Sequence, residues 1–234
     1  MSKPKIIAFD IETGGLPPEK IRKIADEFKE DAVKIGNLGL EKGLEKIAAA
    51  RVTHYDRIEK TAALNAEYGK VLAIGWSDVG LEEIIATGDE GEILARFWKR
   101  IEAALVATKF KEVWVGHNCF GFDLPFLIRR SLILGVKIPS GILERGRYWA
   151  GIFIDTMEVF AAGEYKRTIS LNRFCKACGL PGKTGDGANF AKLLEEDEDK
   201  ALDYLRNDVE ITHALASRIV PVAFPDLFLE EGKQ

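Results

Sequence analysis

Two acidic residues interrupt an apolar segment near the start of the chain. Asp10 and Glu12 lie in the run KIIAFDIETG at residues 5–14, just before a Gly-Gly-Leu-Pro-Pro stop. The β-branched and aromatic residues predict a strand, and residues two apart on a strand point to the same face. Neighbouring buried carboxylates repel each other, so a divalent cation between them is the simplest partner. An edge strand with a solvated polar face is the alternative.

A second group of polar residues lies in the middle of the chain. The segment GHNCFGFDLPFL, residues 116–127, follows a predicted strand and opens a predicted helix. Asp123, with Pro125 two residues later, also fits a helix N-cap, and Asn118 fits an ordinary turn residue. The segment alone therefore leaves a structural role and a chemical role open for Asp123.

A third group lies in the late segment DYLRNDVEIT, residues 203–212. Tyr204 and Asp208 are four residues apart and therefore share one face of a predicted helix. Asp208 falls at the border of an apolar stripe that is formed by Ala201, Leu205, Val209, Thr212, Leu215 and Ile219. An acid in this place is either a ligand beside the core or a partly exposed surface residue.

The hydrophobic pattern of the rest of the chain predicts the strands and helices that position these residues. We predict further strands at 70–76, 81–87 and 112–116, and helices at 90–107, 123–134, 170–178, 188–196 and 200–219. Strands come first and helices dominate later, which predicts an α/β fold with a mixed sheet flanked by helices. A charged stretch from Glu19 to Ile47 has apolar residues at helical spacing and predicts one or two helices inserted after the first strand.

The composition is that of an ordinary soluble globular protein. The 234 residues are 47% hydrophobic and 30% charged, with a formal net charge of −4 that excludes no partner, because a local basic patch can still bind a polyanion. We find no secretory leader, no apolar run long enough for a membrane span, and only three cysteines. We therefore expect a cytoplasmic protein with no membrane partner.

Taken together, the three groups resemble the DEDD superfamily of 3'→5' exonucleases, in its tyrosine branch. The histidine branch would have a histidine five residues before the last acid, where this chain has Asp203. The segment HNCFGFDLPFL is similar to the proofreading exonuclease domain of family B DNA polymerases. Residues 174–187 are similar to stand-alone predicted exonucleases related to that domain. The resemblance covers about Lys5–Thr13 and Ala66–Leu215.

The resemblance implies a ribonuclease H-like fold, with residues 1–234 forming a single exonuclease domain and about 17–66 an inserted helical segment. Such a long insert is unusual for the family, and it is either a wall or lid over the substrate or surface decoration. The residues that match the family's metal-binding and catalytic acids are Asp10, Glu12, Asp123 and Asp208, which would hold two Mg²⁺ or Mn²⁺ ions. Tyr204 matches the residue that orients or deprotonates the attacking water. Thr13 and Leu16 would lie by the terminal nucleotide, and Asn118 and Phe122 would line the site, although core packing is an equal alternative for Phe122.

The implied function is metal-dependent hydrolysis at the 3' end of single-stranded nucleic acid, with DNA favoured over RNA, releasing nucleoside monophosphates. The alternatives are an RNA 3'-end trimming exonuclease, an endonuclease on the same fold, and a non-catalytic nucleic-acid-binding module. A polymerase or DNA repair partner would act in trans.

Several weaker patterns accompany these motifs. Scattered basic residues form either a strand-binding patch or a solvated surface: Arg129, Arg130, Arg145, Arg147, Lys166 and Arg167. Gly182-Lys183-Thr184 lacks the earlier glycine of a phosphate-binding loop. Cys175 and Cys178 lack a second ligand pair, so zinc is not expected.

Overall fold

The computed structural model describes residues 4–78, 81–85, 88–106, 112–143, 151–182 and 190–228. Arg145, Arg147 and residues 183–187, which were singled out above, lie outside the described residues. The chain divides into two compact units. The larger unit comprises Met1–Glu12 and Val71–Gln234, and the smaller unit comprises Thr13–Lys70.

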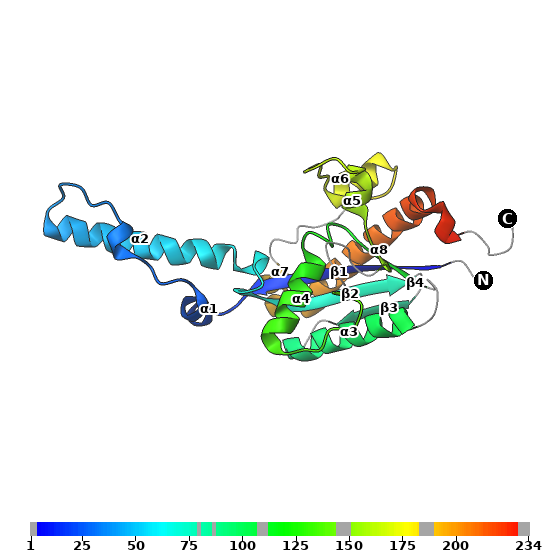
Figure 1. Cartoon of the computed structure of the whole chain (residues 1–234), viewed down its shortest axis with the longest axis horizontal. Coiled ribbons are helices and arrows are strands. Elements are labelled where there is room, and N and C mark those ends of the chain that lie inside the picture. Colours follow the sequence, from blue (N-terminus) through cyan, green and yellow to red (C-terminus); the bar gives the residue numbers. More distant parts are fainter. Residues whose placement is uncertain are drawn as a thin grey trace. The chain divides into compact units, whose positions relative to one another are not determined.

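The larger unit holds a mixed sheet and most of the helices (Figure 1). Its strands are β1 (Lys5–Gly15, which continues into the smaller unit), β2 (Gly69–Asp78), β3 (Leu81–Ile85), β4 (Glu112–Gly116) and β5 (Phe153–Asp155). Its helices are α3 (Glu90–Val106), α4 (Asp123–Leu134), α5 (Thr156–Ala161), α6 (Leu171–Ala177), α7 (Phe190–Glu196) and α8 (Glu198–Ala223), followed by a 3₁₀ turn at Pro225–Phe228. No described helix is long and apolar enough to cross a membrane.

The strands form one sheet in the order β3-β2-β1-β4-β5. Strands β2 and β3 are antiparallel, whereas β4 runs parallel to both β1 and β5. The predicted mixed sheet is therefore confirmed, and β1 is its central strand. We did not predict β5, because three residues are too few to show a periodic pattern.

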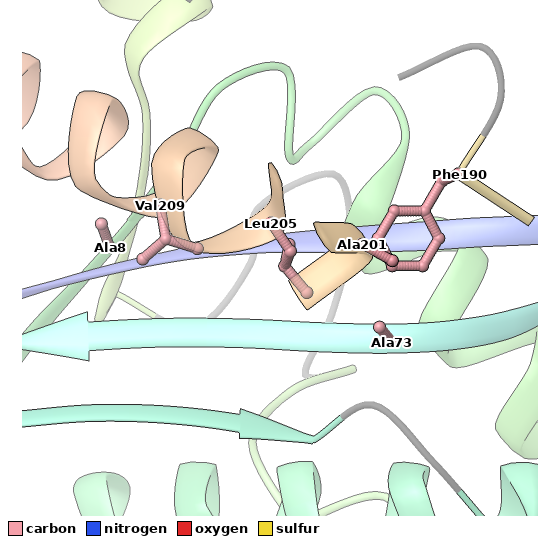
Figure 2. Close-up of a cluster of buried hydrophobic side chains, with 6 residues drawn as sticks. All are labelled: Ala8, Ala73, Phe190, Ala201, Leu205 and Val209. Carbon is pink, nitrogen blue, oxygen red and sulfur yellow. The ribbon is translucent and has the colours of Figure 1, made fainter. Parts of the chain in front are cut away.

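One face of the sheet packs against α8 through small residues. Ala8 of β1 and Ala73 of β2 lie beneath Leu205 and Val209 of α8, and Phe190 of α7 closes the cluster (Figure 2). A Cβ atom added to Gly75 of β2 would lie 2.9 Å from the Leu205 side chain. Glycine at this position thus permits the close approach of helix and sheet, and the predicted apolar stripe of α8 is the surface that packs.

The opposite face of the sheet is aromatic. The tilted rings of Phe9 and Trp114 lie 6.1 Å apart between ring centres, and the Phe97 ring of α3 lies 6.0 Å from each of them. Because side chains alternate along a strand, Phe9 and Ala8 serve these two different faces. The large rings fix α3 against the sheet on one side, and the small residues admit α8 on the other.

A buried ion pair joins α3, α4 and the start of β2. The Arg130 guanidinium donates to both Glu90 oxygens, at 2.9 and 2.7 Å, and the Val71 backbone N–H donates to the same carboxylate at 2.8 Å. Arg130 is buried, so it belongs neither to a strand-binding patch nor to a solvated surface, the two alternatives that the sequence left open for it. The planar, forked guanidinium of arginine suits this bidentate role in the core.

The smaller unit contains α1 (Pro18–Ile24) and α2 (Leu40–Lys60), with 3₁₀ turns at Glu30–Ala32 and Ala62–Leu64. The helical segment predicted after the first strand is therefore present. Its side-chain contacts include the ion pair of the exposed Arg22 with the half-buried Glu59. The half-buried rings of Phe28 and His54 lie 5.6 Å apart between ring centres.

We predict that Gly75→Ala will lower the free energy of unfolding by about 1–3 kcal/mol, the usual cost of overpacking a core. The added methyl group must displace Leu205 and Val209, and α8 with them. Urea unfolding measures the loss. Gly43→Ala is the matched control, because the nearest side-chain atom there is at 3.5 Å and alanine favours the helix. Equal stabilities of the two variants would contradict the close packing at Gly75.

Candidate active site

The central strand presents two acids to the face that α8 covers. Asp10 and Glu12 follow Ala8 at alternate positions of β1, so the three side chains share one face. Glu12 is buried and Asp10 is half-buried. The alternative of an edge strand with solvated acids is therefore wrong, because β4 and β2 flank β1.

Helix α8 carries a third acid to the same place. Asp208 adjoins Val209, which packs on the sheet, and its side chain is only 1% exposed. Carboxylate oxygens of Asp10, Glu12 and Asp208 lie within 4.8 Å of one another. The alternative of a partly exposed surface acid for Asp208 is thus wrong.

Asp123 is the first residue of α4 and is also buried. Phe122 occupies the N-cap position, and no side chain caps this helix, so the N-cap interpretation of Asp123 was wrong. Burial raises the pKa of the Asp123 carboxyl well above its usual value, and the negative charge of Asp10 raises it further. A backbone hydrogen bond from Ile11, between Asp10 and Glu12, opposes these effects and places Asp123 beside β1.

Tyr204 lies one helical turn before Asp208 and faces the same cluster. Burial raises the pKa of the Tyr204 phenol, and the charge of Asp208 and a hydrogen bond to its carboxylate raise it further. The charges of Glu12 and Asp10 act in the same direction. The phenol therefore stays protonated, and its O–H donates to Asp208. A protonated phenol can orient a water molecule but is a poor base.

Asp155, at the end of β5, organises the loop that precedes Asp123, a role we did not predict. Its buried carboxylate accepts hydrogen bonds from the backbone N–H groups of Asn118 (2.9 Å), Phe120 (2.9 Å) and Met157 (2.8 Å). It also caps α5. In the sequence, Asp155 follows the apolar pair Phe153-Ile154 and precedes the helix α5. This position is typical of an N-cap, and it could have identified the structural role of Asp155.

The predicted substrate-binding residues fall in both units. In the larger unit, Asn118 adopts a left-handed conformation (φ 64°), and Phe122 is half-buried with its ring 5.5 Å from that of Phe126. In the smaller unit, the Thr13 hydroxyl donates to the Ala63 carbonyl at 2.7 Å, and the Leu16 N–H donates to the Tyr68 carbonyl at 2.8 Å. Substrate binding by these four residues stays a prediction.

The donor set fits a hard divalent cation. Asp10, Glu12 and Asp208 offer only carboxylate oxygens, the ligands that Mg²⁺ and Mn²⁺ prefer. Ligand oxygens around one octahedral Mg²⁺ lie about 3–4 Å apart, so small side-chain movements would bring this cluster to coordinating distance. A bound cation would also offset the repulsion that now raises the pKa of Asp123.

Comparison with known proteins defines the family. Residues 53–223 match the family described as predicted 3'-5' exonucleases related to the exonuclease domain of PolB. The match covers more than half of the chain, and the chain belongs to this family. It is therefore a 3'→5' exonuclease by class. The matched region contains Asp123, Tyr204 and Asp208, whereas Asp10 and Glu12 precede it and reach the site through β1.

Two DNA polymerases are similar to parts of this chain. A DNA polymerase of Pyrococcus glycovorans is 34% identical over 68 residues, which are 29% of this chain and 8% of the polymerase. The structure of the family B DNA polymerase from Pyrobaculum calidifontis aligns with 93% of this chain and 25% of its own, at 17% identity and a TM-score of 0.57. This likeness confirms the ribonuclease H-like exonuclease fold. The chain spans a quarter or less of these polymerases.

Exonuclease I of E. coli, solved in complex with an oligonucleotide, aligns with 97% of this chain and 42% of its own. Its identity is 14% and its TM-score 0.43, which is too low to support a conclusion about this chain.

We predict that Asp123→Asn will raise the melting temperature in EDTA at neutral pH. A carboxyl whose pKa is raised in the folded state binds more protons folded than unfolded, so its contribution to stability falls as the pH rises between the two pKa values. Asparagine removes this charge, and a gain of about 1 kcal/mol corresponds to about 2–4 °C for a chain of this size. Differential scanning fluorimetry measures the change.

The same experiment with Mn²⁺ tests metal binding. The wild type should gain melting temperature on addition of Mn²⁺, and Asp123→Asn should gain less. The control is Asp203→Asn, because Asp203 lies on α8 but its side chain is 72% exposed and pairs with Arg206. Identical behaviour of all three proteins would contradict the assignment of Asp123 to a cation site.

Proposed function

We propose that this exonuclease hydrolyses single-stranded DNA from its 3' end and releases nucleoside monophosphates, using two Mg²⁺ or Mn²⁺ ions held by Asp10, Glu12, Asp123 and Asp208. The observation that carries the proposal is the convergence of carboxylates from β1, α4 and α8 beside the phenol of Tyr204. Two bound ions would stabilise both the attacking and the leaving oxygen of the phosphodiester.

The other step in hydrolysis is to orient the attacking water. The Tyr204 phenol, protonated and beside Asp208, is placed to hold the attacking water by a hydrogen bond. The water oxygen bonds to phosphorus and releases one proton to solvent. The bond from phosphorus to the 3' oxygen of the preceding nucleotide breaks, and that oxygen takes a proton from solvent. The 3' nucleotide leaves as a 5'-monophosphate.

Two observations support an unpaired DNA end as the substrate. Two of the proteins that match parts of the chain are DNA polymerases, which favours DNA over RNA. Glu12 and Asp208 are buried, so an unpaired 3' end would reach them more readily than an end held in a duplex. The family's relation to PolB supports a polymerase or repair partner in trans.

Asp208→Asn is expected to abolish shortening of 5'-labelled single-stranded DNA. Loss of a residue that only supports a metal ligand lowers activity by up to about 100-fold. Loss of the ligand itself should lower activity by at least as much. Gel analysis with Mg²⁺, Mn²⁺ or EDTA measures the ladder, and Asp203→Asn is the control from the exposed face of the same helix. Equal activity of the two variants would refute the proposal.

RNA of the same sequence and a circular single-stranded DNA complete this experiment. Faster shortening of RNA would favour the trimming exonuclease, and cleavage of the circle would favour an endonuclease. Failure of the folded wild type to cut any of them would favour a non-catalytic binding module.

Tyr204→Phe should lower kcat by about 100-fold, the lower range for a group that assists proton transfer, while leaving Mn²⁺ affinity nearly unchanged. The phenylalanine keeps the ring but removes the phenol oxygen that would accept a hydrogen bond from the water. Steady-state kinetics and Mn²⁺ titration by calorimetry measure the two quantities, with Tyr55→Phe on α2 as the control. A parallel loss of kcat and of metal affinity would show that Tyr204 supports the metal site instead.

A further inference from the structure

The larger unit has a pocket of about 790 Å³ whose lining includes none of the four acids and not Tyr204. Two segments line it: the loop of Asn118, Phe120 and Gly121 before α4, and the stretch from Ala161 to Arg167 after α5. Asp155 and Met157 form part of its wall. The volume is ample for more than one nucleotide unit, since small-molecule sites span about 300–1,000 Å³.

This pocket lies beside the loop that leads to Asp123. Asp155 lines the pocket, and its carboxylate accepts hydrogen bonds from the backbone N–H groups of Asn118 and Phe120 in that loop. Gly121, also in the lining, precedes Asp123 by two residues. A strand whose terminal phosphodiester lay at the acids would therefore have this pocket beside it.

The two lining segments also hold the unusual backbone of the unit. Within the described chain, the non-glycine residues with positive φ are Asn118 (64°), Ala162 (49°) and Lys166 (62°). Each of these conformations costs free energy for a residue with a side chain, and such residues gather at ligand sites. Short turns hold them, including the bond from the Glu164 N–H to the Ala161 carbonyl at 2.8 Å.

The rim of the pocket carries an exposed aromatic ring beside a cation. Tyr165 is 82% exposed, an unusual position for so large a ring. The Lys166 ammonium lies 5.2 Å from the centre of that ring, and the Arg167 guanidinium lies 5.8 Å from the centre of the Phe160 ring. Exposed rings beside basic groups are the means by which proteins bind single strands without reading sequence.

The acidic residues of the lining limit the electrostatic part of this binding. Glu158 and Glu164 oppose Lys166 and Arg167 in charge, while the Asp155 oxygens accept three backbone hydrogen bonds. The pocket therefore offers little net attraction for phosphate. Stacking on Tyr165 should dominate, and salt should weaken binding only modestly.

We propose that this pocket and its rim, Tyr165–Arg167, bind the single strand on the 5' side of the scissile phosphodiester, with Tyr165 stacked on a base and Lys166 and Arg167 at the neighbouring phosphates. The proposal rests on the proposed function for the position of the strand, and it adds a second subsite to the acid cluster. It assigns the rim to affinity for long substrates and not to chemistry.

Fluorescence anisotropy of a labelled oligothymidylate of about 12 nucleotides, in EDTA, tests the subsite without any catalysis. Tyr165→Ala should weaken binding by about tenfold, the effect of losing one stacked base. Tyr165→Phe keeps the ring and should bind as the wild type does. Lys137→Ala is a control for an exposed cation outside the pocket. Equal binding by Tyr165→Ala and the wild type would overturn the proposal.

A minimal substrate separates this inference from the proposed function. The p-nitrophenyl ester of thymidine 5'-monophosphate is too short to reach the rim, so Tyr165→Ala should hydrolyse it at the wild-type rate while its KM for the long oligonucleotide rises about tenfold. A slower reaction of the variant on the short ester would place Tyr165 in the catalytic site and overturn the inference. If the wild type cuts neither substrate but still binds DNA through Tyr165, the proposed function fails and the subsite stands.

Discussion

The close packing of α8 on the central strands is the contact on which the rest of the site depends. Ala8, Ala73 and Gly75 leave room for Leu205 and Val209 to reach the sheet (Figure 2). Because Tyr204 and Asp208 adjoin these packed residues on the helix, the same contact brings them to Asp10 and Glu12. Ordinary apolar packing thus sets the positions of the charged groups.

This arrangement works against the stability of the protein without a cation. Glu12, Asp123 and Asp208 are buried, and burial of a carboxylate beside others is unfavourable, as the raised pKa of Asp123 shows. The surrounding core offsets the cost, through the aromatic face of Phe9, Phe97 and Trp114 and the ion pair of Arg130 with Glu90. Rigid packing therefore holds acids in a geometry that a divalent ion would stabilise, which is how preorganised sites commonly form.

The sequence predicted most elements and the acids themselves, because alternation in β1 and the stripe of α8 are strong periodic signals. It could not show that Asp208 is buried. A side chain at the border of an apolar stripe can be buried or exposed, and the packing of the helix on the sheet decides which. It also missed β5 and the role of Asp155, which acts through backbone hydrogen bonds to Asn118 and Phe120. The burial of Arg130 was also missed, because its partner, Glu90, lies forty residues away. Long-range contacts of this kind leave no local pattern.

The central claim is that carboxylates from β1, α4 and α8 form one binding site for divalent cations. Anomalous diffraction from crystals grown with Mn²⁺ tests it most directly, because the signal locates the metal independently of activity. The account predicts manganese among Asp10, Glu12 and Asp208, with a second ion beside Asp123. Crystals in which these carboxylates are well ordered but manganese binds elsewhere would contradict it.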